Sequence, residues 1–181
     1  MPHYQQHDAM VAPNIADPLA SWAMARVEAK VVVPVGVNVA FAVSQTQGEI
    51  RYRWDPFVRS QELLDGASEP AKGVRTRTRS RHGLTMISQY TSFRPPNQVG
   101  MKMVEGPWFF HTFGGGWSFR AIDDDRTEAT WRYVFTVSPG FLAGAVEPVG
   151  MKILQRDIDR RIEGYARGCK DPVVLAAVAG V

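Results

Sequence analysis

The chain has 181 residues, of which 45% are hydrophobic and 22% are charged, enough for one globular domain with a substantial core. Its formal net charge of +3 is too small to indicate a nucleic-acid or membrane-surface protein by itself. Cys169 is the only cysteine, which excludes an internal disulfide and a zinc site built from several thiolates. The first residues lack the pattern of a secretion signal, and no segment approaches the roughly 20 apolar residues of a membrane span. We therefore expect a soluble, cytoplasmic protein that does not insert stably into membranes.

The first part of the sequence predicts a strand followed by two short helices. Residues 1–25 contain three prolines among residues of mixed polarity, which favours an irregular lead-in. The β-branched run at 26–35 is typical of a strand. Apolar residues at 35–45 suit a short helix, and 48–58 suits a second one that Pro56 would end.

In the middle of the sequence the hydrophobic pattern changes to a period of two, which is typical of strands. Clusters of Gly, Pro, Asn and Asp divide this region into segments that predict an antiparallel meander of about six strands. The segments are 61–66, 72–83, 84–97, 98–107, 109–125 and 126–140.

Residues 141–168 predict the one long amphipathic helix of the chain. Apolar residues recur there at helical spacing, and charged residues fill the positions between them. We expect Gly168 to end the helix. The apolar tail at 169–181 is too short to span a bilayer, so it is expected to pack on the domain or to fray.

The order of these elements and four of the segments resemble a known superfamily. VVVPVGVNVAF resembles its first strand and the short helix that follows, and WDPFVRSQELL resembles the tryptophan-centred end of its second helix. GGWSFRAIDDDRTEATWRYVF resembles its last hairpin, and the helix beginning near Phe141 resembles its C-terminal helix. Over residues 26–168 the chain thus resembles the START-related polyketide cyclase/dehydrase and lipid-transport superfamily.

This resemblance implies an α+β helix-grip fold in a single domain at 26–168. In that fold a curved antiparallel sheet wraps around a long C-terminal helix, and two short helices follow the first strand. A deep apolar cavity between sheet and helix would bind a lipid, sterol, quinone, polyketide or plant-hormone-like ligand. One segment departs from the family pattern, because IRYRW replaces the acidic turn before the tryptophan of the second helix. The contacts of Arg51 and Arg53 therefore do not follow from the resemblance.

Alternation along the expected strands indicates which side chains would face such a cavity. In 126–140 the aromatic residues share one face, while Glu, Thr and Arg share the other. The methionines of 98–107 alternate with Lys102, which places them inside, where flexible side chains suit irregular ligands. The candidate ligand-binding residues are Tyr90, Met101, Met103, His111, Trp117, Phe119, Trp131, Tyr133 and Phe135.

Two of these candidates suit catalysis as well as binding. His111 has a side chain that titrates near neutral pH and is a candidate general acid or base. Tyr133 would bring a hydroxyl that needs a partner inside the cavity. The alternative is that the aromatic residues form plain core and that His111 is a hydrogen-bonded core residue. The remaining histidines show no metal-ligand spacing, so we expect neither a metal nor another cofactor.

The glycines at 114–116 interrupt the aromatic-rich stretch FFHTFGGGWSFRAI. Their spacing fits neither a Walker-type phosphate loop nor a dinucleotide-binding fingerprint. Because alternation continues on both sides, we interpret the triplet as a bend in one long strand that lets the sheet close around the helix. A one-residue bulge at these glycines would reverse the parity of one flank, so that His111 and Trp117 would not both face the cavity.

Strict alternation in 72–83 places four arginines on one face of a strand and Val, Thr and Ser on the other. These are Arg75, Arg77, Arg79 and Arg81, called the arginine face below. They form either a solvated surface that pairs with neighbouring acids, or a site for anions or for an acidic protein such as an acyl carrier protein. No aromatic residues interleave with them to stack bases, so a nucleic-acid partner is not expected.

Three functions are compatible with these expectations. The first, which we favour, is binding or transport of a hydrophobic small molecule in the internal cavity. The alternative is a polyketide aromatase/cyclase or dehydratase that acts in the same cavity through His111 and Tyr133. The third is a protein-interaction module that uses the arginine face, and a homodimer is also left open.

Overall fold

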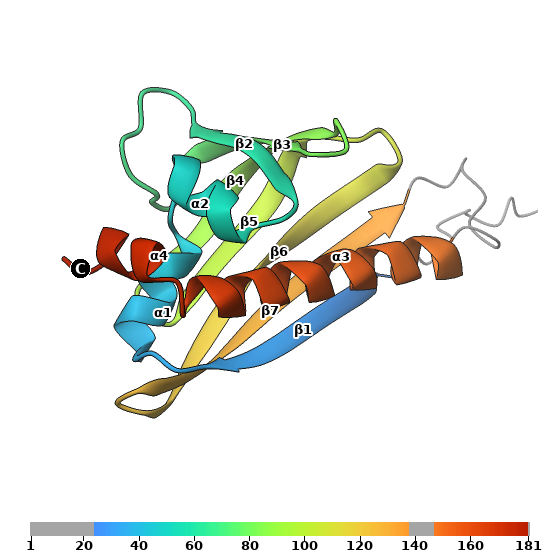
Figure 1. The fold of residues 1–181 in the computed structure, drawn as a ribbon. Coiled ribbons are helices and arrows are strands. Elements are labelled where there is room, and N and C mark those ends of the chain that lie inside the picture. Colours follow the sequence, from blue (N-terminus) through green and yellow to red (C-terminus); the bar gives the residue numbers. More distant parts are fainter. Residues whose placement is uncertain (1–23, 138–146, 181) are drawn as a thin grey trace, which may run out of the picture.

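The computed structural model describes residues 24–137 and 147–180 (Figure 1). Nearly all of the expected N-terminal lead-in at 1–25 lies outside the described residues, as does the expected start of the C-terminal helix at 141–146. Within the described residues, a strand, two helices, six strands and a long helix follow one another in the order that the sequence predicts. A further short helix then follows.

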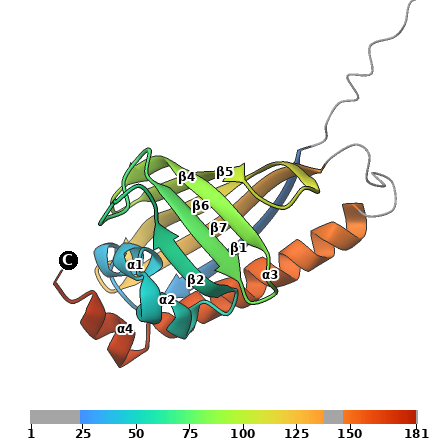
Figure 2. The same cartoon turned by 90° about the horizontal axis from the view of Figure 1, so that it is seen from above.

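Seven strands form one antiparallel sheet. They are β1 (Ala25–Val33), β2 (Val58–Leu63), β3 (Arg75–Ser80), β4 (Thr85–Arg94), β5 (Gln98–Glu105), β6 (Phe110–Asp123) and β7 (Arg126–Val137). Their order across the sheet is β1-β7-β6-β5-β4-β3-β2, so β2 to β7 form the predicted meander and β1 lies beside the last strand. Figure 2 shows that this sheet is strongly curved.

Four helices accompany the sheet in the described part of the chain. They are α1 (Val37–Ser44), α2 (Gly48–Trp54), α3 (Glu147–Gly168) and α4 (Pro172–Ala177). Helix α3 crosses the open side of the curved sheet, and α1, α2 and α4 gather at one end of the molecule (Figures 1 and 2). The arrangement confirms the predicted α+β helix-grip fold.

Close backbone packing explains the three glycines in β6. A Cβ atom at Gly115 would lie 2.3 Å from the carbonyl oxygen of Arg132, and one at Gly116 would lie 2.0 Å from that of Val99. A side chain at either position would therefore push the neighbouring strands apart. Strand β6 pairs with β5 and β7 through all three glycines without a register shift. The triplet thus suits a tightly curved part of the sheet, and it contains no bulge.

Helix α3 is held closely against the segment that ends α2. A Cβ atom at Gly164 would lie 2.2 Å from the carbonyl oxygen of Trp54, so only glycine allows this approach. One turn further on, the Trp54 side chain packs against Gly168. Between them, the Tyr165 ring contacts Trp54 edge to face, and the Tyr165 hydroxyl donates a hydrogen bond of 2.7 Å to the carbonyl oxygen of Ala40.

The tail after α3 packs on the domain over its described part. Asp171 caps α4, because its carboxylate accepts a hydrogen bond from the backbone N–H of Val173 and also pairs with Arg53. Val174 and Val178 are buried in the same core as the sheet residues. The contact of Arg53, which the resemblance left open, is therefore to the N-terminal cap of α4.

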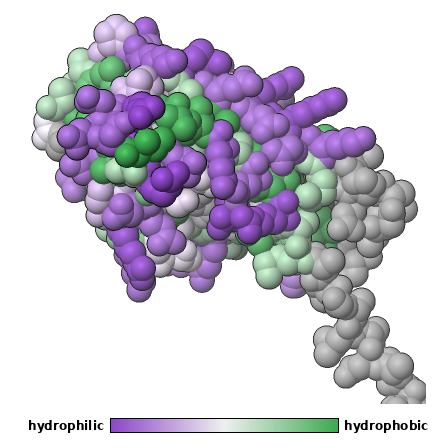
Figure 3. Space-filling view, turned by 90° about the horizontal axis from the view of Figure 1, so that it is seen from below, coloured by the Kyte–Doolittle hydropathy of each residue, from purple (hydrophilic) through white to green (hydrophobic). Residues whose placement is uncertain are grey.

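The outer face of the sheet is polar, as alternation requires. Arg132 on β7 pairs with Glu28 on β1 at 2.8 Å, and Arg120 on β6 pairs with Glu128 on β7 at 3.2 Å. Figure 3 shows one side of the molecule, on which hydrophilic side chains predominate and hydrophobic areas are smaller. Among the described residues, no helix has the length and the apolar character needed to cross a membrane.

Candidate functional site

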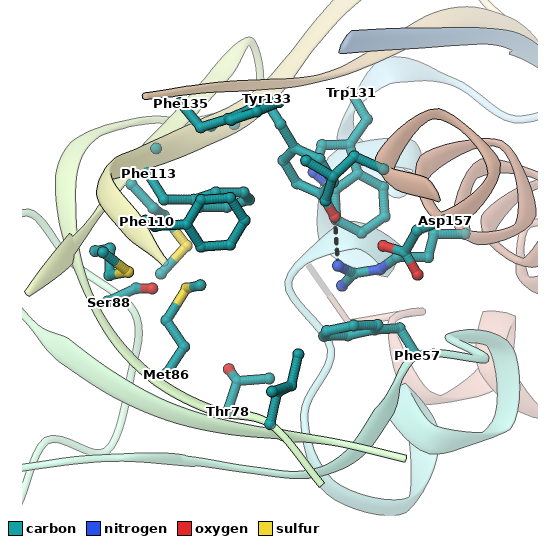
Figure 4. Close-up of a pocket in the computed structure, with 18 of the residues that line it drawn as sticks. Phe57, Thr78, Met86, Ser88, Phe110, Phe113, Trp131, Tyr133, Phe135 and Asp157 are labelled. Carbon is teal, nitrogen blue, oxygen red and sulfur yellow. Dashed lines mark hydrogen bonds between the residues drawn. The ribbon is translucent and has the colours of Figure 1, made fainter. Parts of the chain in front are cut away.

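A cavity of about 990 Å³ lies between the curved sheet and α3 (Figure 4). Strands β2 to β7 and helix α3 all contribute side chains to it, and the end of α1 and the following α2 close one side. Leu84 and Ile153 line it and are themselves exposed, so they lie at its rim. The fold thus provides the internal cavity that the resemblance implies.

One end of the cavity is apolar. Three methionines and three phenylalanines line it, and Figure 4 shows labelled members of this group on the side away from Asp157. They are Met86, Met101, Met103, Phe110, Phe113 and Phe135. The rings are in mutual contact, since the centroid of Phe113 lies 4.8 Å from that of Phe110 and 5.1 Å from that of Tyr133. Such a surface suits an apolar body of irregular shape.

The other end is built around a buried carboxylate. Asp55, which directly follows α2, is fully buried and lies between two buried arginines. Arg51 is one helical turn before it and donates through Nε at 2.9 Å, and its Nη1 donates to the carbonyl oxygen of Ser44 at 2.6 Å. Arg161 from α3 binds both Asp55 oxygens, with Nε and Nη2 at 3.1 and 2.8 Å. This bidentate geometry fixes the plane of the Arg161 guanidinium.

Arg161 is also held by aromatic rings. Its guanidinium lies 4.1 Å from the ring centroid of Trp131 and 4.5 Å from that of Phe57 (Figure 4). Its Nη1 donates a short hydrogen bond to the hydroxyl oxygen of Tyr133, drawn as the dashed line in Figure 4. A carboxylate, a guanidinium and a phenol are therefore linked in series, and Arg161 and Tyr133 line the cavity.

Burial and charge set the protonation of this group. Burial by itself would raise the pKa of Asp55, but Arg161 and Arg51 outweigh it and hold that pKa below its ordinary value. Burial raises the pKa of Tyr133 well above its usual range. Burial also raises the pKa of Asp157, which lines the cavity on α3. At neutral pH Asp55 is thus ionised and Tyr133 is a neutral hydrogen-bond donor.

Most of the candidate residues do line the cavity. The structure places seven of the nine on its wall: Tyr90, Met101, Met103, Trp117, Trp131, Tyr133 and Phe135. For Met101, Trp117, Trp131, Tyr133 and Phe135, alternation predicts the orientation because β5, β6 and β7 pair with one another without a register shift over those positions. That they contact a ligand stays a prediction.

The prediction that His111 lies inside the cavity is wrong. His111 is exposed and is not among the lining residues. The register of β6 against β7 shifts between Phe110 and Thr112, so the parity changes there and Phe110 lines the cavity instead. The irregularity thus lies before the glycines rather than at them. Its consequence is that Trp117 faces the cavity and His111 does not.

Phe119 is buried but belongs to the core rather than to the cavity wall. Its ring stacks on Trp117 at 5.6 Å and meets Phe41 of α1 edge to face at 5.7 Å. The expectation that Phe119 contacts a ligand is therefore corrected to a core position, because α1 covers this part of the sheet.

The arginine face lies outside the cavity and is partly paired with acids. Arg75 pairs with Asp65 at 2.8 Å, and Arg77 pairs with Glu62 of the neighbouring strand β2 at 2.7 Å. Both pairs are exposed, so they favour the solvated surface among the two interpretations. Docking of an acidic protein on this face stays a prediction.

The sequence analysis did not find the buried group of Arg51, Asp55 and Arg161, nor the half-buried Asp157 beside it. A signal for Arg161 was present, because it falls between Ile158, Ile162 and Tyr165 on the apolar face of α3. A charged residue on an apolar stripe needs a buried partner. The partner, Asp55, lies about a hundred residues earlier in the chain, which no local pattern indicates.

Comparison with known proteins agrees with this class of fold. The family described as polyketide cyclase / dehydrase and lipid transport matches residues 24–169, and the chain belongs to that family. No curated protein matches the chain.

Solved structures with the same fold are distant in sequence. A protein from Thermus thermophilus has a TM-score of 0.67 at 17% identity, covering 84% of this chain and 99% of its own. A START superfamily protein from Mycobacterium smegmatis has a TM-score of 0.67 at 13% identity, covering 80% and 97%. The Zhui aromatase/cyclase from a Streptomyces species has a TM-score of 0.62 at 18% identity, covering 86% and 94%. At these identities the likeness concerns the fold alone.

Proposed function

We propose that this protein binds or transports a hydrophobic small molecule in the cavity between its sheet and α3. The observation that carries the proposal is the cavity itself, about 990 Å³ in volume with a wall of methionine and aromatic side chains. Cavities of this size accommodate lipid-sized or polycyclic ligands, and a few polar groups at one end would fix their orientation. The family's description, which includes lipid transport, supports the same class of ligand.

Native mass spectrometry of the purified full-length protein tests this proposal. We expect a co-purified ligand, or binding of members of a panel of lipids and polyaromatic compounds. Phe113→Ala enlarges the apolar end and should weaken binding across the panel, whereas Arg79→Gln on the arginine face should not. A protein that is empty and binds nothing in the panel would refute the proposal.

A second candidate is catalysis in the same cavity, of the aromatase/cyclase or dehydratase type. The series Asp55, Arg161 and Tyr133 favours it, because a phenol that accepts a hydrogen bond from a guanidinium is polarised to donate a hydrogen bond to a ligand carbonyl and so to polarise it. Tyr133 is the group for this role, since His111 lies outside the cavity. If Tyr133→Phe turns over a poly-β-ketone substrate as fast as the wild type, this candidate is wrong.

A further inference from the structure

The charged side chains that line the cavity are strongly unbalanced. Asp157 is the one acid among the described lining residues. Two of the lining cations, Arg51 and Arg161, are buried, and three, Lys102, Arg156 and Arg160, are exposed to solvent. Asp55, which lies behind the wall, offsets only one of the two buried guanidinium groups. Because a buried positive charge is costly unless it is paired, this end of the cavity favours a ligand that brings a negative charge.

Hydrogen-bond donors at this end are left over for such a ligand. A guanidinium has five N–H donors, and Arg161 uses Nε and Nη2 on Asp55 and Nη1 on Tyr133. The described residues offer acceptors to no other N–H of Arg161. The Tyr133 oxygen accepts from Arg161, and the Tyr133 hydroxyl donates no hydrogen bond to another described residue. Since both side chains line the cavity, these donors are available to a group with more than one acceptor oxygen.

The site is rigid before any ligand arrives. Phe57 and Trp131 hold the two faces of the Arg161 guanidinium, and Asp55 holds its edge through two hydrogen bonds. A ligand therefore does not have to order this side chain on binding, which lowers the entropic cost of recognition. Arg161 lines the same cavity as Phe110, Phe113 and Met86, whose side chains Figure 4 shows together with that of Tyr133.

We propose that this polar end binds the carboxylate of a singly charged amphipathic acid, whose apolar body lies against the methionine and phenylalanine side chains. The inference rests on the proposed function and narrows its ligand class. A planar carboxylate matches the remaining N–H donors of Arg161 together with the Tyr133 hydroxyl. Such a ligand would also complete the charge balance of two arginines against Asp55.

Asp157 would then compete with the ligand. It lines the cavity and interacts with Arg161, Arg160, His82 and Asp55. An ionised Asp157 repels a ligand carboxylate, and burial already disfavours its ionised form. Removing the charge by Asp157→Asn should therefore improve binding of an acid and leave a neutral ligand unaffected.

Isothermal titration calorimetry of the full-length protein with dodecanoate, dodecanol and dodecyl phosphate tests the inference. We expect dodecanoate to bind about tenfold or more tightly than dodecanol, as one charge-assisted contact allows. Equal affinities would overturn the carboxylate inference and leave the proposed function intact. If none of the three binds, the carboxylate inference fails, and the proposed function is then decided by the panel of lipids and polyaromatic compounds. Tighter binding of dodecyl phosphate than of dodecanoate would overturn the assignment to a carboxylate.

Two variants test whether the preference for dodecanoate over dodecanol arises at the polar end of the cavity. Tyr133→Phe removes one donor at constant shape and should lower the preference for dodecanoate over dodecanol about three- to tenfold. Asp157→Asn should raise that preference at neutral pH. Arg79→Gln, which removes the same kind of charge from the outer face, is the control and should leave the preference unchanged. If neither Tyr133→Phe nor Asp157→Asn changes the preference, the polar end does not bind the acid and the inference is wrong.

Discussion

Asp55 is fully buried and binds Arg51 and Arg161 at the same time. Each guanidinium is itself buried, so its positive charge has lost most of its hydration. Without Asp55 the two cations would face each other in a poorly solvated environment, and the pair would be strongly unfavourable. The charge of Asp55 is therefore needed to keep Arg51 and Arg161 in place at the polar end of the cavity.

Asp55→Asn is expected to lower the free energy of unfolding by about 3 to 5 kcal/mol, the range for removing one member of a buried ion pair. The amide keeps the size of the side chain but not its charge. Urea denaturation measures the loss. Asp65→Asn is the matched control, because Asp65 pairs with Arg75 on the exposed surface, and it should change the stability little. A stable Asp55→Asn protein would mean that the guanidinium charges are balanced in another way.

His111 and Phe113 are only two residues apart, yet the register shift separates them functionally. Phe113 lines the cavity and His111 does not. We expect Phe113→Ala to weaken dodecanol binding by about tenfold, since full burial of a phenyl side chain is worth about 1.5 to 3 kcal/mol and the half-buried Phe113 supplies part of that. His111→Ala should leave that affinity unchanged. Equal losses in the two variants, measured by calorimetry, would show that the shift does not turn His111 away.

At the scale of elements, the contact between α3 and the end of α2 places the site. Arg161 comes from α3 and Asp55 directly follows α2, so the distance between these helices sets the geometry of their ion pair. Gly164, on the next turn of α3 after Arg161, allows the close approach because the carbonyl oxygen of Trp54 occupies the space of a Cβ atom. The short helix α2 is therefore part of the site as well as part of the fold.

Alanine substitutions at two glycines of α3, Gly164 and Gly150, distinguish the effect of helix propensity on stability from the effect of packing. Gly164→Ala would place a Cβ atom 2.2 Å from the Trp54 carbonyl oxygen, so it should destabilise the protein by about 1 to 3 kcal/mol through overpacking. A Cβ atom at Gly150 meets no described atom within 4 Å, so Gly150→Ala should stabilise by about 0.5 to 1 kcal/mol. Thermal unfolding of both variants checks the opposite signs. If both variants are more stable than the wild type, helix propensity rather than the contact with Trp54 governs both positions.

At the scale of the whole molecule, the sequence predicts the fold well because apolar residues recur with a period of two in the strands and at helical spacing in α3. Alternation in β7 continues without a break, so it correctly predicts that Trp131, Tyr133 and Phe135 face inward. The prediction fails for His111 because a register shift leaves no trace in the alternation of residue types. The polar end of the cavity escapes prediction for a different reason. Arg51 and Asp55 meet Arg161 only after the chain has folded, and long-range contacts of this kind have no local signal.

The stability of the whole protein should depend on pH through two carboxylates that act in opposite directions, the buried Asp55 and the half-buried Asp157. The pKa of Asp55 is lowered in the folded state, so its contribution to stability is present above its unfolded pKa and is lost as the pH falls through the folded value. The pKa of Asp157 is raised, so its contribution is present below its unfolded pKa and is lost as the pH rises through the folded value. Stability should therefore be highest in mildly acidic solution, between the two transitions.

Asp157→Asn separates these contributions, because asparagine keeps the shape and does not titrate. The wild type should gain melting temperature as the pH falls from neutral towards the ordinary range of a carboxyl group, since protonation removes the charge of Asp157 from a half-buried position. The variant should lack this gain and should already be the more stable protein at neutral pH. Both proteins should lose stability at still lower pH, where Asp55 is protonated and the two arginines lose their partner.

Melting temperatures of both proteins, measured across this pH range in the absence of ligand, test whether Asp157 causes the gain. Parallel profiles for the two proteins would show that Asp157 has an ordinary pKa in the folded state, and that it is well solvated at the wall of the cavity.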